Sequence, residues 1–180
     1  MILSNFYRIL ETFSKGKDNG ASTTLVKMDG TTVNCRWSSG REYYIYDILY
    51  FSQLSSHSNS LTTSGIAFGT GTTPPTFNDY KLSGELITNL SVSNTVSKNQ
   101  DGNGTIEFTT VSLITNNNAT DVTIGEVAYV HMNQSCYPTS TSIITGYYMC
   151  ERTVLDTPVT IPAGGIGQVT YTIRMNYPTA

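Results

Sequence analysis

The segment 167–177, GQVTYTIRMNY, carries the plainest secondary-structure signal in the sequence. Large apolar side chains alternate along it with polar ones, at the two-residue period of a β-strand that has one buried and one exposed face. The apolar series is Val169, Tyr171, Ile173, Met175 and Tyr177. The inward face of such a strand buries several large side chains, each contributing roughly 1.5–3 kcal/mol when fully buried.

Similar segments recur through the second half of the chain. Further strands are expected at residues 90–96, 105–115, 121–132, 146–155 and 158–162. Turns rich in asparagine, aspartate and glycine separate several of them, which favours direct antiparallel connections. Within 105–115 the apolar positions change phase, from Ile106 and Phe108 to Val111 and Leu113, and this change predicts a β-bulge.

The first half of the chain contains one clear hairpin signal, in residues 23–37, TTLVKMDGTTVNCRW. Asp29 and Gly30 would supply the positive φ angles of a tight turn between its two arms. Residues 42–51, EYYIYDILYF, are dense in tyrosine and isoleucine, which favours a strand over a short helix. The polar residues 52–64 are expected to form a surface loop.

The composition agrees with a domain built almost entirely from strands. The chain contains 28 threonines, 19 serines and 14 asparagines among 180 residues, a mixture that suits the outer faces of strands and disfavours long helices. Helical crossovers are absent from the pattern, so a parallel sheet is not expected. We predict an all-β fold, an antiparallel β-sandwich or jelly-roll-like domain, over residues 21–180.

The charge and the N-terminal sequence argue against two classes of partner. Charged residues make up 13% of the chain and the net charge is −3, whereas nucleic-acid binding requires a basic stripe. Residues 1–13 are too short, and too interrupted by Arg8 and Glu11, to form a signal peptide or a membrane span. We therefore expect neither a nucleic-acid partner nor a membrane partner.

Residues 1–20 carry the one helical signal. Apolar side chains recur there at three- and four-residue steps, so a short helix would have one apolar face. They are Ile2, Leu3, Phe6, Ile9, Leu10 and Phe13. Such a helix must pack on its own domain or on a neighbouring subunit. We treat residues 1–20 as an N-terminal helix or anchor arm, and the six apolar residues as candidates for an assembly anchor.

Histidines and cysteines give no reactive constellation. His57 is most simply a solvated loop residue and His131 a strand-end residue, and no Gly-x-Ser-x-Gly elbow accompanies them. Cys35, Cys136 and Cys150 do not have metal-ligand spacing, so buried thiols are expected, with a Cys136–Cys150 bridge as the alternative. No metal site and no cofactor are predicted.

Two carboxylates lie in otherwise apolar strand segments, Glu126 and Glu151. They could be imagined as the acid pair of a glycosidase, since such enzymes need two carboxyl groups at a suitable separation. The favoured interpretation is structural, because a carboxylate near a core must be paired or hydrogen-bonded. Arg152 or a backbone donor could compensate Glu126.

The stretch 65–82, GIAFGTGTTPPTFNDYKL, has glycines at Gly69 and Gly71 and so raises the question of a phosphate-binding loop. Phosphate binding requires a helix that begins next to the glycines, and Pro74 with Pro75 prevents one there. The stretch is therefore expected to be a turn followed by a stiff extended segment. It would lie across the sandwich and fix the shape of the loop, without a ligand.

Three segments together resemble the β-rich domain of tailed-bacteriophage virion proteins, such as tail-collar or baseplate fibre attachment domains and small virion proteins of gut phages. They are GIAFGTGTTPPTFNDYKLSGEL at 65–86, IGEVAYV at 124–130 and MCERTVLDTPVTIPAGGIGQVTYTIRMN at 149–176. The residues that match are Gly69, Gly71, Pro74, Asp79 and Leu82 in the loop, Glu126 in the middle strand, and Arg152, Leu155, Pro158 and Gly164 in the last segment. The likeness covers residues 65–177 and departs at Ala128, where those domains usually carry glycine.

The resemblance implies a non-enzymatic virion structural protein, present in many copies in the tail or neck or as a decoration of the capsid. It would be assembled in the bacterial cytoplasm, and its partners would be other copies of itself and other virion proteins. The alternative is a carbohydrate-binding or receptor-binding module of a phage fibre, because Trp37 and the 12 tyrosines could form a stacking surface for a host glycan. An esterase or glycosidase using His131 or Glu126 is the enzymatic rival.

Overall fold

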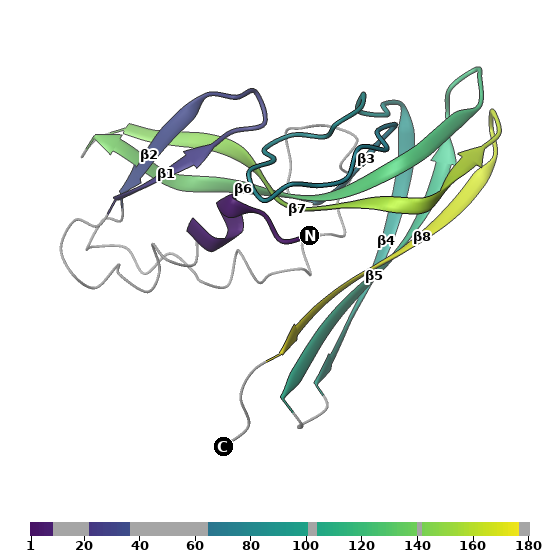
Figure 1. The fold of residues 1–180 in the computed structure, drawn as a ribbon. Helices are drawn as coiled ribbons and strands as arrows, with labels where there is room; N and C mark the ends of the chain where they lie inside the picture. The colour runs from purple at the N-terminus through teal and green to yellow at the C-terminus, as the bar shows by residue number, and fades with distance from the viewer. Residues whose placement is uncertain (9–21, 37–64, 101–103, 140–141, 177–180) are drawn as a thin grey trace.

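The fold comes from a computed structural model (Figure 1). The structure describes residues 1–8, 22–36, 65–100, 104–139 and 142–176. Several sequence-based predictions lie outside these residues. They are the strand at 42–51, the loop at 52–64, and the placement of Ile9, Leu10 and Phe13.

The described residues form one short helix, at residues 4–8, and antiparallel strands in three sheets. A hairpin pairs β1 (Ser22–Val26) with β2 (Thr32–Arg36). Sheet I has the order β3-β6-β7, with β3 at Gly65–Gly69, β6 at Val122–Thr139 and β7 at Ser142–Ile161. Sheet II has the order β4-β5-β8, with β4 at Leu90–Gln100, β5 at Thr105–Asn116 and β8 at Ile166–Asn176. The predicted all-β, sandwich-like fold with a short N-terminal helix is confirmed.

The main core lies where one face of sheet I packs on the inner face of sheet II. Phe68, Val127 and Tyr129 contribute from sheet I, and Ile114 and Val169 contribute from sheet II. A second apolar cluster covers the opposite face of sheet I. Its members are Leu3, Met28, Ala67, Leu82, Ala128, Val130 and Met149. Sheet I is thus buried on both faces in its central part.

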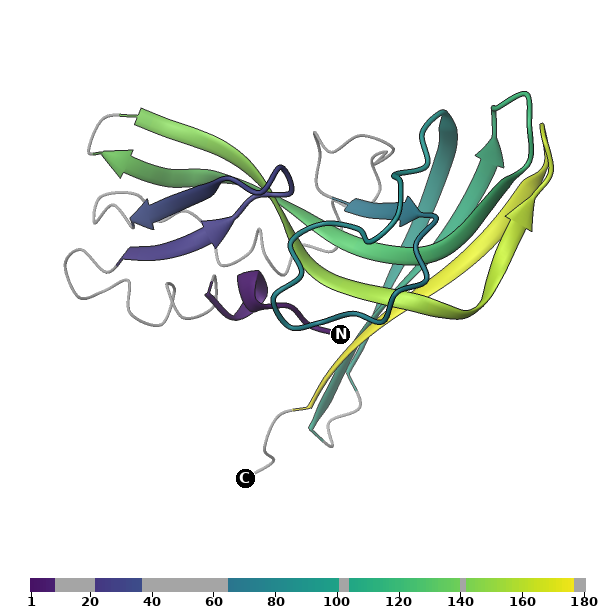
Figure 2. The same ribbon diagram turned by 45° about the horizontal axis from the view of Figure 1, so that its top comes forward.

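Sheet I contains two long strands that extend beyond the sandwich, where the β1–β2 hairpin lies beside β6 (Figures 1 and 2). Register shifts interrupt the β6–β7 ladder at four places, the first between Ile124 and Glu126. The segments 146–155 and 158–162, predicted as two strands, form parts of the single strand β7. The register shifts bend the pair so that it serves both the sandwich and the hairpin.

Sheet II is a regular ladder, and the prediction of a β-bulge within 105–115 is wrong. The strand β5 pairs without interruption with β4 on one side and β8 on the other. The inner face carries Thr110 and Ser112, which are 2% and 0% exposed, while Leu113 points outward and is 48% exposed. Thr110 and Ser112 stand opposite Tyr171 and Val169, whose larger side chains occupy the interior there. A bulge would have broken both ladders at once.

The β1–β2 hairpin has the predicted turn in a modified form. Gly30 takes a positive φ of 85°, but Asp29 does not adopt a positive φ. The Asp29 carboxylate instead accepts hydrogen bonds from the backbone N–H and the hydroxyl of Thr31. An aspartate that bonds two residues ahead stabilises a turn without a left-handed conformation of its own.

Candidate functional site

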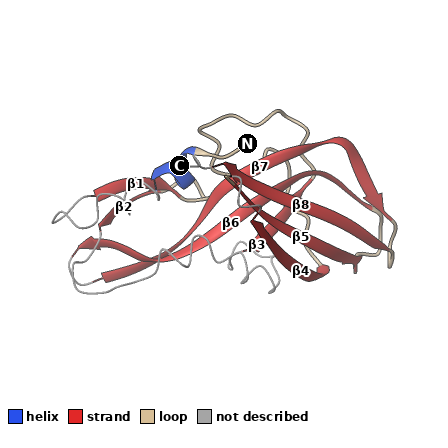
Figure 3. Ribbon diagram, turned by 90° about the horizontal axis from the view of Figure 1, so that it is seen from below, coloured by secondary structure: helices blue, strands red, loops and turns tan. Residues whose placement is uncertain are grey.

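The loop between β3 and β4 is closed at its base and folded back over sheet I (Figure 3). The N–H of Thr70 donates to the carbonyl of Glu85, and the N–H of Glu85 donates to the hydroxyl of Thr70. The loop buries Leu82 in the second apolar cluster, against sheet I. We call residues 70–85 the closed loop.

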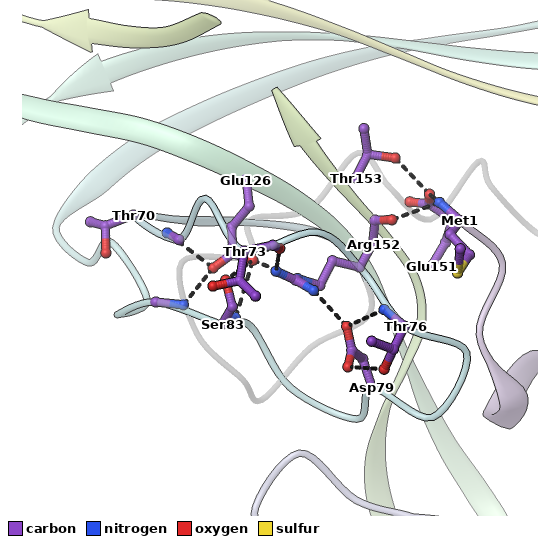
Figure 4. A network of polar contacts seen from close by, with 12 residues as sticks. Met1, Thr70, Thr73, Thr76, Asp79, Ser83, Glu126, Glu151, Arg152 and Thr153 are labelled. Atoms are coloured by element: carbon purple, nitrogen blue, oxygen red, sulfur yellow. Dashed lines mark hydrogen bonds and ion pairs between the residues drawn. The ribbon is translucent and has the colours of Figure 1, made fainter. Parts of the chain in front are cut away.

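Glu126 of β6 holds this loop in place from beneath (Figure 4). Its side chain is 0% exposed, and it accepts hydrogen bonds from the backbone N–H groups of Gly71, Ser83 and Gly84, at 3.1, 3.1 and 2.8 Å. The Ser83 hydroxyl and Nε of Arg152 also donate to it. Both ends of the closed loop are therefore bound to one buried carboxylate.

The glycines of the GTG motif make room for this carboxylate. A Cβ on Gly71 would lie 2.3 Å from Oε1 of Glu126, 2.0 Å from Oγ of Ser83 and 2.5 Å from the amide nitrogen of Gly84. A Cβ on Gly84 would lie 2.3 Å from the amide nitrogen of Gly71. The two glycines are required because both backbone segments converge on the same carboxylate.

Arg152 of β7 links the carboxylate to the far end of the loop. Its guanidinium donates to Oε2 of Glu126 at 2.6 Å, to the carboxylate of Asp79 and to the carbonyl of Thr73. Asp79 in turn accepts hydrogen bonds from the N–H and hydroxyl of Thr76. The arginine is 1% exposed and its single positive charge lies between two carboxylates, whose remaining negative charge is stabilised by hydrogen bonds from backbone N–H and hydroxyl groups. We call Asp79, Glu126 and Arg152 the buried charge network.

The network keeps its carboxylates ionised. Burial alone would raise the pKa of Glu126, but hydrogen bonds from Gly84, Arg152 and Ser83 lower it below its ordinary value. The pKa of Asp79 is lowered too, because the hydrogen bonds from Thr76 and Arg152 outweigh the effect of burial. A carboxylate held in this way accepts hydrogen bonds and is poorly suited to donate a proton as a general acid.

Glu151 accepts its hydrogen bonds from other donors than Glu126 does, so no donor bridges the imagined acid pair. Its Oε1 accepts hydrogen bonds from the Met1 ammonium at 2.6 Å and from the Thr153 hydroxyl at 2.7 Å. Its pKa is raised by burial, and these two donors offset that effect only in part. No residue in the described ranges binds both Glu126 and Glu151 (Figure 4). Both carboxyl groups are buried, since Glu126 is 0% exposed and Glu151 is 8% exposed.

The first eight residues pack on the sandwich. Ile2 bridges to Glu151 of β7, and the N–H of Leu3 donates to the carbonyl of Cys150. Leu3 and Phe6 are buried in the two apolar clusters. The apolar face was predicted to pack either on its own domain or on a neighbouring subunit, and Leu3 and Phe6 pack on their own domain. The assembly anchor itself stays a prediction.

His131 and Cys150 are both buried on β6 and β7. Burial lowers the pKa of His131 to about 4, and its Nδ1 has no hydrogen-bond partner among the residues that the structure describes. Burial also raises the pKa of the Cys150 thiol well above its usual range. Cys150 is a free cysteine, so a Cys136–Cys150 bridge is excluded. Neither group is placed as an activated nucleophile or base.

Two aromatic side chains are exposed beside the closed loop. Tyr7 of the helix and Phe77 of the loop are each 51% exposed, with ring centroids 5.7 Å apart and planes tilted by 42°. The N–H of Ser4 donates to the carbonyl of Phe77, which holds the helix against the loop. We call Tyr7 and Phe77 the aromatic pair.

The sequence indicates only part of this site. The pairing of Glu126 with Arg152 follows from the need of a buried carboxylate for a counter-charge. The roles of Thr73, Thr76 and Ser83 were not predicted. The spacing of Thr76 and Asp79, three residues apart, is typical of side chains that bond each other's backbone in turns, and it is the signal that could have indicated a folded loop.

Three further observations concern metal sites, membrane-spanning helices and similarity to known proteins. Among the described residues there is no cluster of histidine, cysteine, aspartate or glutamate that could hold a metal ion. The same part of the chain contains no helix that is long and apolar enough to cross a membrane. No known protein family matches the chain, and comparisons with curated proteins and with solved structures give no significant match.

Proposed function

We propose that this chain is a non-enzymatic structural protein of a bacteriophage virion. It would be present in many copies, in the tail or neck or as a decoration of the capsid, with other copies and other virion proteins as its partners. The phage assignment depends on the resemblance of residues 65–177 to tailed-phage virion domains. The structural role is supported independently by the way in which the chain uses its buried charges.

The buried charge network is the observation that carries the proposal. The carboxylate of Glu126 binds both ends of the closed loop, and Arg152 binds Asp79 and Thr73 of the same loop. Three of these hydrogen bonds fix backbone groups of the loop directly, and the fourth, from Arg152 to Asp79, fixes a side chain of the loop. Catalytic charges, by contrast, are directed at a space that a substrate can enter. The network is therefore suited to hold an exposed loop in one shape, which is what a repeated assembly contact requires.

The exterior of sheet II suits a protein that is packed beside many copies of itself. The first four outer positions of β4 carry neutral hydroxyl side chains, and all four are exposed. They are Ser91, Ser93, Thr95 and Ser97. Such a surface remains soluble without strong repulsion between neighbours, because it carries little charge.

The proposal is tested by the composition of purified particles. Virions banded from a culture that produces this chain are digested and analysed by mass spectrometry. We expect its peptides to band with those of the capsid and tail proteins, and electron cryo-microscopy of the particles to assign its position. If the chain remains in the soluble fraction while the other virion proteins band, the proposal is wrong.

A second candidate function is binding of a host surface glycan, and the aromatic pair favours it. Exposed aromatic rings on a rigid support are a common platform for stacking against apolar ligand faces. The test is a glycan array with host surface polysaccharides, comparing the wild type with a Tyr7→Ala/Phe77→Ala variant. Leu113→Ala, at an exposed apolar residue on sheet II, is the matched control. Binding that is absent in the wild type, or equal in both variants, argues against this function.

A further inference from the structure

The outer edge of β8 is open. Within the residues that the structure describes, β8 pairs only with β5, and its other edge has no backbone hydrogen bond to any segment. Alternate N–H and C=O groups of an edge strand point away from its sheet and can pair with another strand. Sheet II extends past the end of sheet I at the C-terminal half of β8, so this part of the edge projects from the rest of the described chain (Figure 1).

The edge lacks the features with which proteins usually protect such strands. It contains no proline and no bulge along Ile166–Asn176. Its one charged residue, Arg174, is paired with Glu107 of β5 at 2.6 Å, so the charge is compensated within the chain. Edge strands that avoid association are typically short, bulged or charged. An edge of this length with none of these features is suited to pairing.

The sequence of β8 complements itself when it is reversed. An antiparallel pair centred on Tyr171 would place Val169 opposite Ile173 of the second copy, on the inner face. On the outer face it would place Thr170 opposite Thr172, and Gln168 opposite Arg174. Apolar residues then face apolar residues and hydroxyls face hydroxyls, and no like charges are directly opposed. This register also uses the whole length of the strand.

From these observations we propose that β8 pairs antiparallel with β8 of a second copy of this chain, about a two-fold axis at Tyr171. The two three-stranded sheets then become one continuous six-stranded sheet. The contact uses the same surface on both copies, so it closes as a dimer, whereas pairing of β8 with β4 of the next copy would continue as an open array. The inference deepens the proposed multi-copy role, and it names the contact that would build the assembly.

A pair of matched variants tests this contact. Thr170→Lys/Thr172→Lys places lysines directly opposite lysines of the second copy. Thr170→Lys/Thr172→Glu changes the same two exposed positions, but it places each new lysine opposite a new glutamate. Both variants lose the contact between the hydroxyls of Thr109 and Thr172, so this loss is the same in each.

The measurement is sedimentation equilibrium of the purified full chain over a range of concentrations. We expect a wild-type dimer, a dissociation constant raised about tenfold or more in the lysine–lysine variant, and a near wild-type constant in the lysine–glutamate variant. Circular dichroism of both variants checks that they are folded. A wild type that is monomeric throughout, an assembly that both variants leave unchanged, or one that both weaken equally would overturn the proposal.

The result is separable from the test of the proposed function. If the chain bands with virions but its self-association does not respond to the lysine–lysine variant, the β8 contact is wrong and the virion role stands. If the dimer forms as expected but the chain never enters particles, the virion role is wrong and the contact stands.

Discussion

Sheet I and sheet II are built from similar residues but are stabilised in different ways. Sheet I is covered on both faces, its β6–β7 ladder is shifted at four places, and it buries Glu126 and Arg152. Sheet II is an uninterrupted ladder with one exposed face, and its ion pair, Arg174 with Glu107, lies at the surface. The comparison shows that the irregular sheet holds the specific contacts that shape the molecule, while the regular sheet presents an adaptable surface.

The largest difference between the two sheets is expected from removing one arginine in each. Arg152→Met leaves Glu126 buried without its counter-charge and releases Asp79, and we expect a loss of about 3–5 kcal/mol in the free energy of unfolding. Arg174→Met breaks an exposed pair and is expected to cost less than about 1 kcal/mol. Urea unfolding of both variants measures this contrast. Equal losses would show that the buried network does not differ from a surface ion pair.

The next largest effect is the dependence of stability on pH, which we attribute to His131 of sheet I. The folded pKa of His131 is about 4, against about 6.5 for the unfolded chain, so the unfolded state binds a proton first as the pH falls. The stability that this provides is complete above pH 6.5 and is lost as the pH falls towards 4, a change of about 3 kcal/mol. Unfolding curves between pH 7 and 4 measure it.

The control for the pH effect is His131→Gln, which cannot titrate and should flatten the curve between pH 6.5 and 4.5. Glu126 and Asp79 have lowered pKa values, so they affect stability at lower pH than His131 does. The stability that they provide is present above the pKa of the unfolded chain and is lost as the pH falls through their folded pKa values. The pKa of Glu151 is raised, so this residue makes the folded state more stable, not less, as the pH falls through its folded pKa. An unchanged slope in the glutamine variant would contradict the assignment to His131.

A smaller effect is expected from adding one methyl group to a glycine in each part of the molecule. Gly71→Ala forces a Cβ against Glu126 and the backbone of Gly84, and we expect a cost of about 1–3 kcal/mol. In Gly167→Ala of β8 the new Cβ meets only side-chain atoms, those of Ile161, and no backbone atom, so we expect a smaller cost. Thermal unfolding compares the two. If Gly167→Ala costs as much as Gly71→Ala, the close approach at the closed loop is not what requires glycine.

The smallest effect tests the regularity of sheet II. Leu113 is exposed, so Leu113→Ser should change the free energy of unfolding by no more than about 0.5 kcal/mol. Had the strand changed phase at Val111, the same substitution would remove a core side chain and cost about 2 kcal/mol or more. Urea unfolding separates these cases.

The difference between the sheets also explains how far the sequence could predict the structure. The β8 segment has one buried face, so its alternation of apolar and polar residues indicates the strand and its inner face. In β5 the same reasoning failed, because Thr110 and Ser112 are buried opposite larger neighbours and Leu113 is not. The local pattern does not record the size of a cross-strand neighbour.

For the closed loop, the sequence indicated the residues that hold it but not the contacts between them. Gly71, Asp79, Glu126 and Arg152 could each be identified as structural residues. Their convergence depends on the register of β6 and β7 and on the return of the loop over sheet I, which are long-range features. The burial of Leu3 and Phe6 was left open for the same reason, since an apolar helix face does not specify which surface covers it.

The central claim is that the buried charge network fixes the closed loop as rigidly as the sheet beneath it. Native-state hydrogen exchange of the amides of Gly71, Ser83 and Gly84, the three that donate to Glu126, tests it most directly. We expect their opening free energies to approach those of the β6–β7 ladder, and to fall first in Arg152→Met. Exchange of these amides at the rate of an exposed loop in the wild type would contradict the account.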